Sequence, residues 1–157
     1  MRSVLIVPAL AAWLFTAMPT PPGPCEVLPA VEVAKLLGVP TVQLDSVNSG
    51  TNELTGVELC SWFVDPRDPR GVTVKLRRAE SADETEAVLA GARIDEQVTL
   101  DRMEAVSGLG DDAHYADWAD GSGGTLIARR GSVVLTITGT VKRADAVTAA
   151  KQALGRL

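Results

Sequence analysis

Stretches in which apolar and polar residues alternate occur in runs along this chain, and this grouping constrains the fold more than any other feature. The clearest pair, Thr125–Arg130 and Ser132–Val141, predicts a hairpin that turns at Arg130-Gly131. In Val72–Arg78 the alternation is typical of a sheet with one covered and one solvated face. Strands that follow one another in runs, instead of alternating singly with helices, predict a mostly antiparallel sheet.

Three amphipathic stretches predict helices that pack on this sheet. They are about Pro29–Leu37, Ser81–Arg93, which opens with the capping box Ser81/Glu84, and Arg143–Arg156. Further strands are expected at Thr41–Val47, Val57–Val64, within Gln97–Val106 and at Asp112–Trp118, with a turn at Asn48–Asn52. The expected order is α-β-β-β-α-(β)-β-β-β-α, an α+β fold with a mostly antiparallel sheet flanked by helices.

The N-terminus has the pattern of an export signal. Arg2 is the only charge before Glu26, and an apolar run follows it, so residues 1–18 are expected to be a signal peptide. The run is interrupted by Pro8 and is shorter than the roughly 20 residues of a membrane span. The alternative is an uncleaved N-terminal anchor; otherwise no stable membrane span is expected. Residues 19–24 predict a stiff Pro-rich spacer, and residues 25–157 a single domain.

The chain has two cysteines, Cys25 and Cys60, which we expect to form a disulfide in an oxidising compartment. The chain-entropy treatment gives a loop of this length about 4 kcal/mol of stabilisation at most. Two distant cysteines and one histidine do not match the closely spaced ligands of a zinc site. Pro24 directly before Cys25 breaks the lipobox pattern, so no lipid is expected there. These features favour a secreted or cell-envelope location outside the cytoplasmic membrane.

Charge and aromatic content limit the classes of partner. The 157 residues carry a net charge of −5, whereas nucleic-acid binders show a basic patch or stripe. The candidate interface residues are Trp118, beside a Gly-rich turn, and Arg129 and Arg130 near a hairpin end. One such tryptophan is too few for a sugar-stacking platform, and Trp62 is expected to cover the disulfide. An envelope protein or a lipid is the class of partner left open, and no nucleic acid is expected.

Few residues are candidates for chemistry. His114 is the only histidine and, with a nearby aspartate, is a candidate general base, although no nucleophile elbow accompanies it. A weak calcium candidate is the acidic group Asp111, Asp112, Asp117 and Asp120, which lacks the EF-hand spacing. We expect these residues to be a surface histidine and a solvated acidic turn, and we expect no metal and no cofactor.

Several segments resemble pieces of one family when taken in order. The segment Cys25–Gly38 is similar to a "C-x-L-L-x-x-x-E-V-A-x-x-L-G" start, and Cys60-Ser-Trp62 to a "C-x-W" strand. Leu109–Ala113 is similar to a "G-L-G-D-x-A" turn that precedes a hairpin. Together they resemble the small exported, often lipidated, domains of unknown function of actinobacterial cell envelopes. The resemblance spans Cys25 to the C-terminus and implies no catalytic residue. By looser analogy the architecture resembles PsbP-like sandwiches, which implies no activity.

These observations predict an exported, disulfide-braced, non-catalytic cell-envelope module that binds a protein partner or a ligand. Two alternatives stay open. One is an envelope hydrolase that uses His114 with a nearby aspartate, which requires His114 to line a concave pocket. The other is a small carrier of a lipid or apolar ligand, which requires a cavity between the sheet and the helices.

Overall fold

The computed structural model describes residues 20–95 and 103–157, so the predicted signal peptide at residues 1–18 lies outside it. Four helices occur in the described residues: α1 (Pro24–Val27), α2 (Ala30–Leu37), α3 (Ala82–Asp95) and α4 (Arg143–Arg156). The strands there are β1 (Gln43–Leu44), β2 (Gly50–Asn52), β3 (Val57–Asp65), β4 (Asp68–Arg78), β5 (Glu104–Ala105), β6 (Asp112–Asp117), β7 (Gly124–Arg130) and β8 (Val133–Gly139). The predicted α+β class is confirmed.

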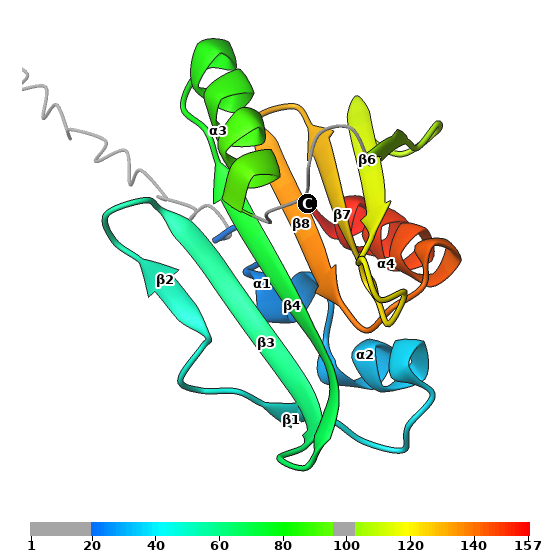
Figure 1. The fold of residues 1–157 in the computed structure, drawn as a ribbon. Helices are drawn as coiled ribbons and strands as arrows, with labels where there is room; N and C mark the ends of the chain where they lie inside the picture. The colour runs from blue at the N-terminus through cyan, green and yellow to red at the C-terminus, as the bar shows by residue number, and fades with distance from the viewer. Residues whose placement is uncertain (1–19, 96–102) are drawn as a thin grey trace, which may run out of the picture.

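All strand pairs in the described residues are antiparallel and belong to one sheet. Its order is β1-β3-β4-β8-β7-β6-β5 (Figure 1). Strand β2 also pairs with β3, at a different part of the strand from β1. Two hairpins, β3–β4 and β7–β8, are joined through the pairing of β4 with β8, in which Val74 lies opposite Ile137. This one contact between distant segments unites the two halves of the chain in a single sheet.

One face of the sheet is covered by α1, α2 and α4, which lie behind it in Figure 1. We call this the closed face. The side chains buried there are almost all apolar, and α4 contributes four alanines to them. The strands contribute Val72, Val74, Leu76, Tyr115, Leu126, Leu135 and Ile137 to this core, and the α4 alanines are Ala146, Ala149, Ala150 and Ala153. Because alanine is short, α4 lies close against the strands.

Covalent and ionic links tie the short N-terminal helices to the closed face. Cys25 in α1 and Cys60 in β3 form the predicted disulfide, with 5.3 Å between their Cα atoms, and Trp62 beside it is 4% exposed. Arg156 at the end of α4 donates to the carbonyl of Val27 at 2.6 Å and to Glu32 Oε2 at 2.9 Å. The Arg156 guanidinium holds the pKa of Glu32 below its usual value.

Among the described elements, only α3 packs on the opposite face, which these elements leave partly uncovered; we call it the open face. Alternate residues of β4 divide between the two faces: Val72 and Val74 are buried in the core, whereas Thr73 and Lys75 are half-buried on the open face. Leu89 of α3 packs on Ile127 and Val134 in a small cluster of its own. Figure 1 shows α3 over one end of the sheet, with the rest of β3 and β4 beyond it.

The structure differs from the predicted elements mainly before β3. The strand predicted at Thr41–Val47 is reduced to β1, because the Asp45 carboxylate accepts the amides of Val47 and Asn48 and turns the chain. The segment predicted as a turn, Asn48–Asn52, contains β2.

Other differences are shifts of boundary. Pro24 begins α1 instead of ending the spacer, since the first helical position needs no amide donor. Within the strand region predicted at Gln97–Val106, residues 97–102 lie outside the described chain, and β5 follows them. Helix α4 has the predicted bounds.

Candidate functional site

Three adjoining hollows open on the open face of the sheet. Their lining side chains come from the residues of β3, β4 and β8 that point away from the closed face, together with α3 and two loops. Neighbouring hollows share residues: Ser61, Thr73 and Asn48 each line two of them. The two hollows that share these residues are therefore continuous, and the remaining one, which Lys75 of β4 lines, lies next to them on the same face of the sheet.

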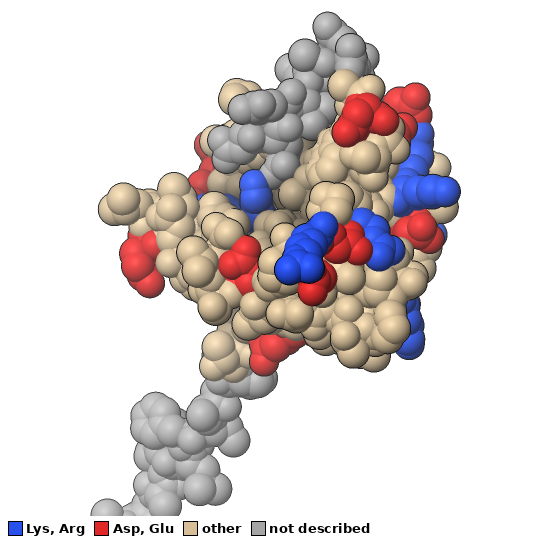
Figure 2. All heavy atoms as spheres, turned by 60° about the horizontal axis from the view of Figure 1, so that its bottom comes forward, with Lys and Arg blue, Asp and Glu red and all other residues tan. Residues whose placement is uncertain are grey.

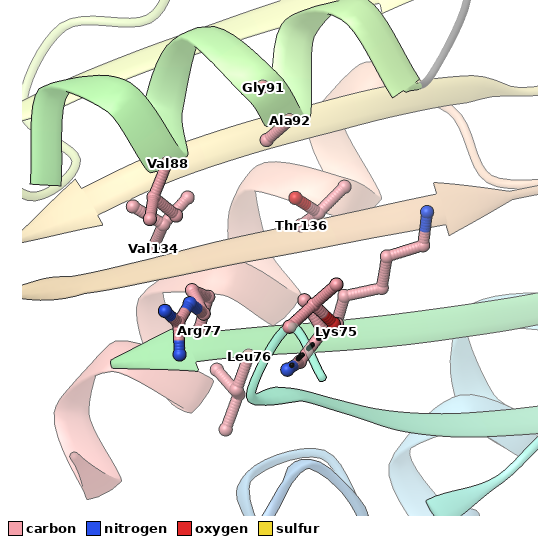
Figure 3. A pocket seen from close by; sticks show the side chains of 10 residues that line it. Lys75, Leu76, Arg77, Val88, Gly91, Ala92, Val134 and Thr136 are labelled. Atoms are coloured by element: carbon pink, nitrogen blue, oxygen red, sulfur yellow. Dashed lines mark hydrogen bonds between the residues drawn. The ribbon is translucent and has the colours of Figure 1, made fainter. Parts of the chain in front are cut away.

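The first hollow, which we call the apolar groove, lies between α3 and the β3–β4 hairpin and has a volume of about 240 Å³. Figure 3 shows Val88 and Ala92 directed from α3 toward the strands, with Val134 of β8 beside Val88. Lys75 and Arg77 of β4 border the opposite side. The groove thus combines an aliphatic wall with a cationic edge.

Gly91 deepens the apolar groove on its helix side (Figure 3). In the described part of the chain, no atom beyond its immediate helical surroundings lies within 4 Å of the position where its Cβ would stand. Glycine in a helix interior is less favourable than alanine by about 1 kcal/mol. The groove therefore exists where the helix lacks a side chain, at a cost to the helix.

A row of hydroxyl side chains crosses the open face at right angles to the strands. Strand register places Ser61, Thr73, Thr138 and Thr125 side by side on β3, β4, β8 and β7. The Oγ atom of Ser61 lies 2.9 Å from Oγ1 of Thr73, and the Oγ1 atoms of Thr125 and Thr138 lie 2.7 Å apart. Ser61 and Thr125 are buried, whereas Thr73 and Thr138 in the middle of this hydroxyl row are half-buried.

The second hollow, the aromatic hollow, has a volume of about 310 Å³ and includes Ser61, Thr73 and Thr138 of the hydroxyl row in its floor. Phe63 of β3 and Trp118, which follows β6, both line it and are half-exposed. Gly71 lies opposite Phe63 in the sheet and also lines this hollow. A Cβ at Gly71 would stand 2.7 Å from the Trp62 carbonyl oxygen, so only glycine fits this strand approach.

Trp118 is fixed in place by the turn that follows it. Its amide donates to the Gly123 carbonyl at 2.9 Å, and its carbonyl accepts from the Gly121 amide at 2.9 Å. The indole Nε1 points at Thr125 Oγ1 at 3.5 Å, which connects the ring to the hydroxyl row. The indole is therefore oriented by the sheet and presents its remaining surface to the aromatic hollow.

The third hollow, the edge hollow, is broad and shallow, with a volume of about 530 Å³, and residues 47–52 form most of its lining. Asp45 organises this loop: Oδ2 accepts Asn48 Nδ2 at 2.7 Å, and Oδ1 accepts two backbone amides. These hydrogen bonds lower the pKa of Asp45. Ser49 Oγ accepts the Ser61 amide at 3.0 Å and joins the loop to the hydroxyl row.

His114, the candidate general base, lies on β6 beneath the far end of α3 and lines none of the three hollows. Arg93 Nη2 lies 3.0 Å from His114 Nδ1 and 3.0 Å from Asp112 Oδ2. Asp112 Oδ1 lies 3.4 Å from the same ring nitrogen. The predicted nearness of His114 to an aspartate is present, but the pair holds Arg93 and thereby fastens α3 to the sheet.

The four aspartates of the calcium candidate have separate roles. Each accepts hydrogen bonds from a different partner: Gly131 for Asp111, Arg93 for Asp112, Tyr115 for Asp117 and Ser122 for Asp120. The bonds from Ser122 lower the pKa of Asp120. Within residues 20–95 and 103–157, no three His, Cys, Asp or Glu side chains are grouped so that they could hold a metal ion.

The three predicted interface residues do not form one surface. Arg129 lies 4.0 Å from Glu86 of α3, and Arg130 donates to the Leu154 carbonyl of α4, so the two point to opposite faces. Trp118 lies at the other end of β7, beside Thr125. Only Trp118 borders a hollow, and the sequence had no signal to connect it with Phe63 or the hydroxyl row.

Charge is mixed over the surface. Figure 2 shows basic side chains next to acidic ones, with uncharged areas between these groups and no single basic patch on the face in view. In the two described ranges, no helix is long and apolar enough to cross a membrane. The chain matches no protein-family model and no curated protein.

Proposed function

We propose that this chain is an exported, disulfide-braced, non-catalytic module of the cell envelope that binds a ligand or a partner protein through the open face of its sheet. The observation that carries the proposal is the gathering of three adjoining hollows on this one face. Concave surfaces with an apolar part and a few oriented polar groups are typical of binding sites.

Two features support the location. The apolar run after Arg2 follows the pattern of a secretory signal, and disulfides such as Cys25–Cys60 persist in oxidising compartments. The non-catalytic part of the proposal is supported by His114, whose Nδ1 faces Arg93 outside the hollows. A binding role requires no chemistry from these side chains.

The location is tested by cell fractionation with thiol labelling. The full chain is produced in its native host, and its cysteines are treated with a maleimide before and after reduction. We expect the protein in the envelope or the medium, with Cys25 and Cys60 labelled only after reduction. A cytoplasmic protein with two reactive thiols would contradict the proposal.

Binding is tested on the full chain isolated from the native envelope, by native mass spectrometry and by crosslinking. A bound species is expected with the wild type and is lost on Thr138→Arg, which places a large cation in the open face. Thr148→Arg is the matched control, because Thr148 is an exposed threonine of α4 on the other side of the sheet. Equal binding by both variants, with both folded by circular dichroism, would exclude the open face.

A carrier of a small apolar ligand is the second candidate, and the apolar groove between α3 and the sheet favours it. Its volume lies below the usual range of about 300–1,000 Å³ for ligand pockets, so only a short apolar group fits. Gly91→Leu fills this groove and distinguishes the candidates. It abolishes binding of a carried apolar ligand and leaves binding in the aromatic hollow intact.

A further inference from the structure

We propose that the aromatic hollow binds a saccharide, of the size of one or two sugar rings. The inference rests on the proposed function, because it names the ligand class of the open face. A saccharide ring has apolar C–H faces and a rim of hydroxyl groups, so its recognition needs flat apolar walls together with neutral hydrogen-bonding partners. The aromatic hollow supplies both.

The walls are the half-exposed rings of Phe63 and Trp118. They come from β3 and from the turn after β6, and both border the same hollow across the strands β4 and β8. Gly71, which pairs with Phe63, lines the hollow beside this ring. Aromatic rings give a large, rigid apolar contact area at low conformational cost, which suits the C–H face of a sugar.

The floor supplies neutral hydrogen-bonding groups. Thr73 and Thr138 are direct neighbours in the sheet, and each hydroxyl is already oriented by one partner, Ser61 or Thr125. A hydroxyl offers one donor and two acceptor positions, so each keeps capacity toward the hollow. The two oriented hydroxyls, on adjacent strands, match a ligand that itself carries hydroxyls in a fixed arrangement.

The charge of the lining selects against anions. Among the described residues that line the aromatic hollow, none is Lys, Arg or His, and Asp45 is an acid. Its carboxylate accepts three hydrogen bonds from Val47 and Asn48, which keep it ionised and oriented at the rim. Cationic side chains bind phosphate and carboxylate ligands most strongly, and the described lining of the aromatic hollow has none. A carboxylate beside neutral hydroxyls suits a neutral polyol, whose O–H groups are donors.

The test uses the oxidised full-length chain, labelled with ¹⁵N, and three soluble probes: cellobiose, maltose and N,N′-diacetylchitobiose. At least one is expected to shift the Thr73 and Thr138 amide signals and the Trp118 indole N–H signal in a saturable way. A sedimentation assay with cellulose and chitin particles distinguishes a free sugar from a polymer as the source. Binding to particles without binding to disaccharides indicates a longer glycan in the same hollow.

Two variants test the residues. Trp118→Ala removes a wall, and Thr138→Val removes a floor hydroxyl with little change of volume; each is expected to weaken binding by about tenfold, the size of one lost contact. Thr148→Val on α4 is the matched control and retains the wild-type affinity.

The proposal is overturned if neither the disaccharides nor the particles bind, or if binding survives Trp118→Ala and Thr138→Val. It is also overturned if the shifts map to Val88 and Ala92 in the apolar groove. In these cases, the envelope can still yield a species that binds the wild type but not the Thr138→Arg variant. The proposed function would then stand, with a ligand of another class. If no saccharide binds and no envelope-derived species is found, the proposed function is refuted as well.

Discussion

The two faces of the sheet are formed by the same strands but differ in how they are packed. On the closed face, the alanines of α4 lie in one buried apolar cluster with Leu126, Leu135 and Ile137. On the open face, α3 makes a small apolar contact through Leu89, and hydroxyls and hollows take up the remainder. The difference shows where stability resides and where the chain has room for another molecule.

The helices explain this difference. Small side chains on α4 allow a close approach along its whole length, whereas α3 is held at its ends by ion pairs, Arg77 with Glu84 and Arg93 with Asp112. Partly exposed ion pairs each contribute at most about 1 kcal/mol. The closed face therefore carries most of the folding free energy, and the open face can be altered without unfolding the chain.

The largest effect is expected from removing a core side chain of the closed face. Leu135→Ala, at a fully buried site, should lower the free energy of unfolding by about 2–5 kcal/mol. Leu59→Ala, at a half-buried site of the open face, should cost about 1 kcal/mol or less. Urea unfolding of both variants measures the difference, and equal losses would mean that the faces do not differ in this way.

Loss of the disulfide comes next. The double change Cys25→Ala and Cys60→Ala should lower the free energy of unfolding by about 2–4 kcal/mol, since the bridge closes a separation of 35 residues and ties α1 to β3. Thermal unfolding of the variant and of the oxidised wild type, measured by calorimetry, gives the value. A change below about 0.5 kcal/mol would show that the bridge is not a structural brace.

A larger side chain is expected to change the free energy of unfolding in opposite directions on the two faces. Ala150→Leu overfills the closed face and should destabilise by about 1–3 kcal/mol. Gly91→Leu enters open space in the apolar groove and gains helix propensity, so it should stabilise by about 0.5–1 kcal/mol. Denaturant midpoints report both changes. Destabilisation of similar size in the two variants would contradict an empty groove.

The smallest effect at neutral pH concerns Tyr115, which is buried in the closed face. Its hydroxyl lies 3.2 Å from Asp117 Oδ1 and from the Val141 carbonyl. Burial, reinforced by the Asp117 charge, raises the pKa of Tyr115 to about 12. In the unfolded chain this tyrosine ionises near pH 10, so the stability it contributes is complete below pH 10 and is lost between about pH 10 and 12.

The variant Tyr115→Phe isolates this contribution. It should cost about 1 kcal/mol at pH 8, where the hydroxyl is hydrogen-bonded, and should show a smaller loss of stability above pH 10 than the wild type. Urea unfolding between pH 8 and pH 11.5 gives both curves. Parallel curves over this range would show that Tyr115 does not titrate differently in the folded chain.

Local patterns predict the parts of this fold that depend on neighbours in sequence. The β7–β8 hairpin follows from alternation around Gly131, whose φ of 57° suits the turn, and α4 follows from its apolar stripe. The short strands β1 and β2 are not predictable in this way. They depend on the Asp45 hydrogen bonds and on pairing with β3.

The candidate site was not predictable for a similar reason. Trp118 stands out in the sequence, but its partner Phe63 is brought to it only by the pairing of β4 with β8. No local signal specifies that pairing. His114 and the acidic turn, which stand out equally, have partners that fasten α3 and the turns instead of a shared centre.

The most direct test of the account is photo-crosslinking in living cells of the native host. The photoreactive p-benzoylphenylalanine replaces either Phe63 in the open face or Thr148 on exposed α4, and adducts are identified by mass spectrometry. We expect an adduct at position 63 whose yield falls when a saccharide is bound, and no adduct at position 148. Adducts only at position 148, or equally at both positions, would contradict the assignment of binding to the open face.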